Sequence, residues 1–211
     1  MGLDRADLKS RAKEELKGKW GTVIGIVVVQ ILIETALTFI PIVKWFSFLV
    51  TPAITLGFTM TGLRLVRHED IDVGNLFDGM QYFFKAFGLA FMTGLFTFLW
   101  ALLLIVPGIV AAYRYGMAIY ILADNPELGI MECIDKSKEM TNGNKGFMFI
   151  LDLSFIGWGI LAALTFGIGC LWLIPYIGIT NTLMYMQFSG GTVGNGKNQT
   201  GDRVYSEQSV Q

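Results

Sequence analysis

The sequence predicts an all-α, polytopic membrane protein, a helical bundle of six transmembrane helices in three hairpins with amphipathic helices on the cytoplasmic side. The chain has 211 residues, of which 53% are hydrophobic and 16% are charged, against about 25% charged residues in soluble domains. Apolar runs of about 20 residues recur along it, and each is long enough to cross about 30 Å of hydrocarbon. Fourteen of the sixteen Lys and Arg residues fall on one side of the resulting topology. The positive-inside rule therefore places both termini in the cytoplasm of a multi-pass cell-membrane protein.

Residues 1–19 are predicted to form a cytoplasmic amphipathic helix that starts at Asp4 as N-cap and ends at Gly18. Leu8, Ala12 and Leu16 would share one face of this helix. The other face is rich in Lys and Arg. We therefore expect the helix to lie against anionic lipid.

Residues 20–188 are predicted to form the transmembrane domain, with polar connections on the cytoplasmic side only. Within it, residues 72–87 carry apolar side chains at helical spacing, which predicts an interfacial amphipathic helix. A further cytoplasmic helix is expected to start at Asn125-Pro126-Glu127 and end at Asn142-Gly143. Residues 189–211 are polar and glycine-rich, which predicts a disordered cytoplasmic tail. The predicted spans are 20–40, 45–66, 86–106, 107–123, 145–166 and 170–188.

The three hairpins are expected to be repeats of one unit, each preceded by a polar cytoplasmic segment that can form a helix. Pro52, Pro107 and Pro175 lie near the outer end of the second helix of each hairpin. Seven residues beyond each proline stand, in order, Thr59, Arg114 and Thr182. This regularity favours a threefold repeat.

Arg114 lies within an apolar span, where a charge costs a few kcal/mol and requires a partner or water. Glu34 lies seven residues before Pro41, and therefore at the same predicted depth as Arg114. We expect the two to form an ion pair inside the bundle. Other polar side chains could line the same interior: Gln30 and Thr38 on the first span, Thr51, Thr55 and Thr59 on the second, and Asn181 and Tyr185 on the sixth.

Two interpretations of these polar residues remain open. Interhelical hydrogen bonds and internal ion pairs commonly hold membrane bundles together, which we favour. The alternative is a pathway for a small solute or ion through Glu34, Arg114 and the neighbouring polar groups. Asp152 lies nearer the cytoplasmic edge, and Arg64, Arg67 or Lys145 are its expected partners.

Motifs that would indicate an enzyme are absent from the sequence. It has no HExxH, GxSxG or Walker motif, no Cys/His cluster, and only one histidine, His68. We therefore expect no enzymatic activity, no cofactor, no metal and no nucleic-acid partner. Cys133 and Cys170 would lie on opposite sides of the membrane and form no disulfide.

Residues 107–185 and the opening LKSRAKEELKGKWG resemble a family of bacterial polytopic membrane proteins, the domain of unknown function 975 family. The most specific parts are SFIGWGIL, GIGCLWLIPY and the T-x-x-x-Y that follows, and the resemblance covers about residues 4–188. It implies a Gram-positive bacterial cell membrane and assigns no activity or site residue. The expected function is that of a non-enzymatic accessory protein acting through lipid, a membrane-protein partner or self-association. A transporter or channel is the alternative.

Overall fold

The computed structural model describes residues 4–39, 41–165 and 167–190, and the side chains of residues 37–48 are not described. Thr38 and the predicted tail therefore lie outside the described part. Every regular element in these ranges is a helix, which confirms the all-α prediction. The elements are α1 Arg5–Leu16, α2 Trp20–Phe39, α3 Pro41–Val66, η1 Val73–Tyr82, α4 Phe83–Leu103, α5 Ile105–Tyr115, α6 Ala118–Asp124, α7 Ile130–Met140, α8 Lys145–Leu164 and α9 Cys170–Phe188.

Four stretches within the described residues are long and apolar enough to cross a membrane. The count rises to five if α1 and α2, which meet at an angle of 94°, form one bent span. These candidates support a membrane protein but do not establish the six predicted spans, because α9 is not among them. Asn181 and Gln187 lower the apolar character of α9. The four stretches are Leu49–Val66, Val73–Leu103, Ile105–Asp124 and Lys145–Leu164.

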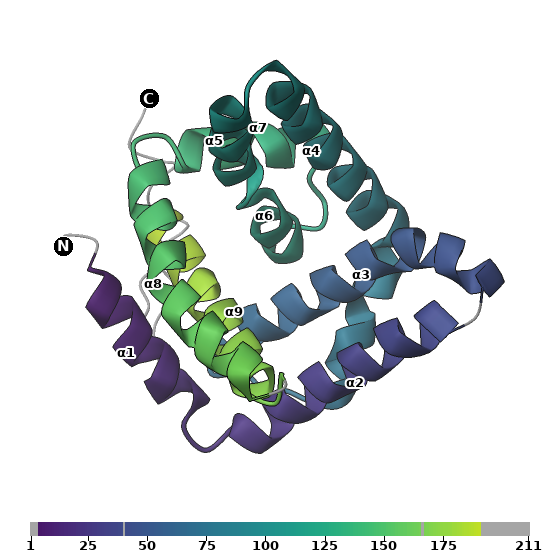
Figure 1. Cartoon of the computed structure of the whole chain (residues 1–211), viewed down its shortest axis with the longest axis vertical. Helices are drawn as coiled ribbons and strands as arrows, with labels where there is room; N and C mark the ends of the chain where they lie inside the picture. The colour runs from purple at the N-terminus through teal and green to yellow at the C-terminus, as the bar shows by residue number, and fades with distance from the viewer. Residues whose placement is uncertain (1–3, 40, 166, 191–211) are drawn as a thin grey trace, which may run out of the picture.

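The elements form three units of the same order, in which a short helix precedes two longer helical segments: α1–α3, η1–α6 and α7–α9. Within the units, α2 contacts α3, α4 contacts α5, and α8 contacts α9. Each short helix also packs on the second segment of another unit: η1 on α3, α7 on α6, and α1 on α9. The last of these contacts joins the two ends of the chain into a ring, and Figure 1 shows α2, α4 and α8 around its outside with α6 towards the middle.

Helix α1 begins and ends as the sequence predicts, but protein covers its apolar face. The Asp4 carboxylate accepts a hydrogen bond from the Ala6 N–H at 3.0 Å, and Gly18 has a φ of +83° just after the helix. Leu8, Ala12 and Leu16 are buried, and α1 packs on α9. The face that we expected to enter the lipid is therefore part of the protein core.

The segment predicted as an interfacial α-helix is the 3₁₀-helix η1 followed by the start of α4. Asp72 caps η1, accepting from the Gly74 N–H, and Asn75 reciprocates to the Asp72 N–H. Runs of 3₁₀-helix longer than three or four residues are uncommon, and tertiary contacts hold this one of 10 residues. It packs against α2 and α3, where Ile26, Ile54 and Leu76 form a buried cluster.

Three predicted boundaries are wrong, and prolines explain two of them. Pro41 and Pro107 were placed in turns, but each lies in the first turn of a helix, α3 and α5 respectively, where the missing N–H costs nothing. Leu104 alone, with extended backbone, separates α4 from α5. The helix expected to start at Asn125 starts instead at Ile130 with Gly129 as N-cap.

The centre of the ring is packed with apolar side chains. Leu63 of α3, Leu122 of α6 and Leu183 of α9 belong to one core cluster, and each is at most 2% exposed. Thr182 lies beside them and donates to the Gly178 carbonyl at 2.9 Å. The second segments of the three units therefore meet in an apolar core.

Candidate functional site

Arg114 lies at the C-terminal end of α5 with its side chain exposed. Among the ion pairs between described residues, none includes Arg114 or joins it to Glu34. Figure 1 shows why, because α2 and α5 lie on opposite sides of the molecule. The predicted Glu34–Arg114 ion pair is therefore absent from this structure. Equal distance from a turn predicted equal depth, but not which helices are neighbours.

The backbone at Arg114 has a specific partner that the sequence did not reveal. The helix breaks between Tyr115 and Ala118, so the Arg114 carbonyl lacks the N–H that a continuous α-helix would supply. Instead, the fully buried Ser137 hydroxyl of α7 donates to this carbonyl at 2.9 Å. Thr141, one turn further along, lies 3.4 Å from the same oxygen. The signal in the sequence was Gly116 inside an apolar run, together with Ser137 and Thr141 at i, i+4.

Glu34 and Gln30 contact one another on α2, as their i, i+4 spacing allows. The Gln30 side-chain N–H donates to the Glu34 carboxylate at 3.2 Å. The other end of the Gln30 amide, Oε1, is buried and has no hydrogen-bond partner among the described groups. Thr55 and Thr59 bond back to the carbonyls of Thr51 and Thr55, each at 2.9 Å, so their hydroxyls are satisfied within α3.

Asp152 and Asn181 have different surroundings from those expected. Asp152 on α8 accepts a hydrogen bond from the Tyr113 hydroxyl at 2.9 Å and forms no described ion pair with Arg64, Arg67 or Lys145. Asn181 Oδ1 on α9 is buried without a described partner. The structure therefore does not bring Glu34, Arg114, Asp152 and Asn181 together as one site. Whether any of them lines a pathway stays a prediction.

A polar junction that the sequence analysis missed joins the ends of α3, α6 and α9. The Asp124 carboxylate binds the Arg67 guanidinium through one oxygen and accepts from the Tyr185 hydroxyl at 3.0 Å through the other. The Tyr185 ring stacks on Tyr120 of α6 at 5.8 Å between centroids. Arg67 and Asp124 each end a predicted span on the cytoplasmic side, which was the available signal. We call Arg67, Asp124 and Tyr185 the junction.

A second ion pair holds η1 against α3. Arg64 lies 2.5 Å from the Asp78 carboxylate, which also accepts from the Asn75 side chain at 3.3 Å. Nearby, the Lys85 ammonium donates to the Pro126 carbonyl at 2.5 Å and links α4 to the loop before α7. Charges at the helix ends therefore bond to each other or to backbone, as expected of a structural role.

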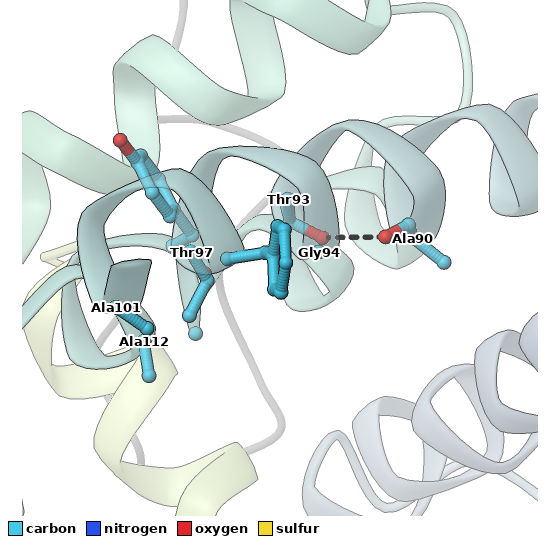
Figure 2. Close-up of a pocket in the computed structure, with 9 residues that line it drawn as sticks. Ala90, Thr93, Gly94, Thr97, Ala101 and Ala112 are labelled. Atoms are coloured by element: carbon cyan, nitrogen blue, oxygen red, sulfur yellow. Dashed lines mark hydrogen bonds between the residues drawn. The ribbon is translucent and has the colours of Figure 1, made fainter. Parts of the chain in front are cut away.

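An open groove of about 520 Å³ runs between α4 and α5 on the surface of the bundle. Figure 2 shows its small side chains, including Ala90, Gly94 and Ala112. The Thr93 hydroxyl in the groove bonds to backbone carbonyls of its own helix, so it offers no unpaired donor. The groove suits close approach of another apolar helix rather than chemistry.

The described residues contain no cluster of three His, Cys, Asp or Glu side chains that could hold a metal ion. Both cysteines are free thiols. Cys133 is fully buried on α7, and burial, with the Glu132 carboxylate nearby, raises the pKa of its thiol. A thiol of raised pKa forms little thiolate, so Cys133 is poorly suited to be a nucleophile.

Comparison with known proteins yields one family. Searches among curated proteins and among solved structures found no match. The family described as "Protein of unknown function (DUF975)" matches residues 1–113 and 101–190. These two segments cover most of the 211 residues, and the match agrees with the family that the sequence resembles. The chain therefore belongs to the DUF975 family.

Proposed function

We propose that this protein is a non-enzymatic accessory or interaction protein of the bacterial cell membrane. The observation that carries the proposal is the apolar centre of the ring, where α3, α6 and α9 pack through Leu63, Leu122 and Leu183. A pathway along this axis would need polar groups and water in that place. The paired charges at the helix ends support the same role, because they join elements to one another.

The surface around α4 and α5 supports a role in binding other membrane proteins. Phe98 and Leu99 are more than half exposed beside the groove, and Leu102 to Val106 continue this apolar surface into the turn. Small residues in the groove would let a partner helix approach closely. A partner helix would therefore contact this face of the protein.

Site-specific photocrosslinking in living cells, combined with flux measurements, tests this function. A photoreactive amino acid at Phe98 is expected to give a discrete adduct with one membrane protein or with a second copy. The same amino acid at Leu89, which is 2% exposed, is the matched control and should give none. Purified protein in liposomes should conduct neither protons nor potassium above the level of empty liposomes. Flux without any adduct at Phe98 would contradict the proposal.

Transport of a small solute or ion is the second candidate, favoured by one observation. The buried amide oxygens of Gln30, Asn181 and Gln187 have no hydrogen-bond partner among the described groups. Such oxygens are costly unless water or a solute satisfies them. If transport is the function, Asn181→Leu abolishes flux. If the oxygens are only structural imperfections, Asn181→Leu leaves the protein as stable as before or more so.

The proposed topology has six spans, α2, α3, α4, the α5–α6 segment, α8 and α9, with both termini in the cytoplasm. The distribution of Lys and Arg supports it, and the free Cys170 at the start of α9 allows a direct test. In a Cys133→Ser background, we expect a membrane-impermeant maleimide to label Cys170 from outside intact cells.

A cysteine introduced at the exposed Ser189, just after α9, is the control for the opposite side. It should react only after the membrane is permeabilised. If Cys170 stays unlabelled in intact cells and reacts only in detergent, the α8–α9 hairpin ends inside the bilayer, and six spans are excluded.

A further inference from the structure

A row of four cations follows one side of α1. Arg5, Lys9, Lys13 and Lys17 recur every four residues, and residues at that spacing lie above one another on a helix. The row lies beside the buried apolar row, because Lys9, Lys13 and Lys17 each follow a residue packed in the core. The packing of α1 on α9 therefore fixes where these cations stand.

Two of the cations lie over aromatic rings of α8 and α9. The Lys9 ammonium is 4.1 Å from the centre of the Phe155 ring and donates to the Ser154 carbonyl at 3.3 Å. The Lys13 ammonium is 5.7 Å from the centre of the Tyr176 ring. The Tyr176 hydroxyl donates in turn to the Lys9 carbonyl at 3.4 Å. The contacts place both ammonium groups on the α8–α9 pair.

None of the four cations in this row has a described carboxylate within ion-pair distance. Other cations do: Lys136 lies 3.2 Å from Glu132, and Lys138 lies 2.7 Å from Asp135. Burial lowers the pKa of Lys9, and the charges of Lys13 and then Arg5 lower it further. The row is therefore a region of positive potential that the described carboxylates leave unbalanced.

The position of the row along α8 shows what kind of anion can reach it. Ser154 lies nine residues beyond Lys145, which is roughly 14 Å along a helix that is apolar enough to cross a membrane. Leu153, Ile156 and Ile160 are each more than half exposed on the same stretch of α8. A ligand here meets cations and an apolar surface together. A soluble anion could use only the cations.

We propose that Lys9 and Lys13 bind the phosphate of an anionic phospholipid whose acyl chains lie along the exposed apolar face of α8. Arg5 and Lys17 extend the positive row on either side. The phosphate supplies the charge that this part of the chain lacks, and the apolar residues of α8 replace contacts that the acyl chains make with other lipids. The site depends on the membrane location and not on the accessory role, so either can fail without the other.

Native mass spectrometry of the full-length protein with phosphatidylglycerol or phosphatidylcholine tests the site. Each lysine near an anionic lipid surface contributes about 1 kcal/mol, so Lys9→Gln/Lys13→Gln should bind phosphatidylglycerol roughly 30-fold more weakly. The matched control is Lys136→Gln/Lys138→Gln, which removes two lysines already paired with carboxylates. It should bind as wild type does. Phosphatidylcholine should bind weakly to all three proteins.

Three further measurements make the result decisive. Lys9→Arg/Lys13→Arg keeps the charges and should retain binding, so it keeps the test valid if the glutamine variant does not fold. Equal loss in the two glutamine variants would overturn the proposal, since net charge alone would then explain binding. Complete competition by inorganic phosphate at the lipid's concentration would also overturn it, by showing that the ligand is a soluble anion.

Discussion

Replacing Gly57 with alanine is expected to lower the free energy of unfolding by about 3 kcal/mol or more, the upper end of the usual cost of overpacking. A Cβ at Gly57 would lie 1.9 Å from the Leu76 carbonyl oxygen and 2.7 Å from its carbon. Both are backbone atoms of η1, so no side-chain rotation can relieve the contact. The 3₁₀-helix would have to move away from α3 and expose Ile26 and Ile54 of their shared cluster.

The reciprocal contact gives a second variant with the same expected outcome. A Cβ at Gly79 would lie 2.0 Å from the Ala53 carbonyl oxygen and 2.5 Å from the Gly57 nitrogen. Gly79→Ala should therefore be as destabilising as Gly57→Ala. Both variants can be measured by unfolding in mixed detergent micelles, followed by circular dichroism.

Gly157→Ala is the matched control, because a Cβ at Gly157 in the interior of α8 meets nothing within 4 Å. Alanine there should be neutral or stabilise by up to about 1 kcal/mol through helix propensity. Equal effects of the alanine at Gly57 and at Gly157 would show that η1 does not pack on α3 as described. Arg64→Gln offers an independent check, since it removes the ion pair to Asp78 without changing the backbone contact.

Replacing Asp124 with alanine is the second change for which we expect a large effect, a loss of about 2–4 kcal/mol of stability. The substitution leaves the Tyr185 hydroxyl, on a residue that is 3% exposed, without its acceptor, which costs about 1–3 kcal/mol. It also removes the counter-ion of Arg67. Because 39% of the Arg67 side chain is exposed to solvent, that part should cost no more than about 1 kcal/mol.

A double-mutant cycle separates the two contributions. Tyr185→Phe removes only the hydroxyl and should cost about 1 kcal/mol. In an Asp124→Asn background, the same change should cost measurably less, because the two groups share one hydrogen bond. Asp135→Asn on the exposed face of α7 is the control and should stay within about 0.5 kcal/mol. Strict additivity in the cycle would show that Asp124 and Tyr185 are not coupled.

The two sets of variants examine different parts of the ring. Gly57 and Gly79 lie where the short helix of the second unit meets the second long helix of the first unit. Asp124 lies where the ends of α3, α6 and α9 meet. A protein that acts through binding should tolerate neither set, because both hold its outer surface in place.

Much of the helical organisation could be predicted from the sequence because it depends on local signals. The Asp4 cap, the end of α1 at Gly18, and the buried row of Leu8, Ala12 and Leu16 follow from capping and periodicity within a few residues. The membrane character also follows from sums over single segments. These predictions needed no knowledge of which helices are neighbours.

The errors all concern partners. Arg114 was assigned Glu34 from depth alone, while its carbonyl bonds to Ser137 on a helix that had been treated as a separate surface element. Asp152 was assigned a cation and bonds instead to Tyr113. Several cations and carboxylates lie on the same predicted side of the membrane, so their order along the chain cannot select one pair among the many that charge alone allows.

By itself, the sequence determined the helical class, the apolar segments and the amphipathic face of α1, because hydropathy, periodicity and capping act over short distances along the chain. Only the tertiary structure decided that α9 covers that face, that η1 packs on α3, and that Asp124 binds Arg67 and Tyr185. These contacts depend on how closely two backbones approach and on which faces meet. At Gly57 and Gly79 the approach is possible only because both residues lack a Cβ.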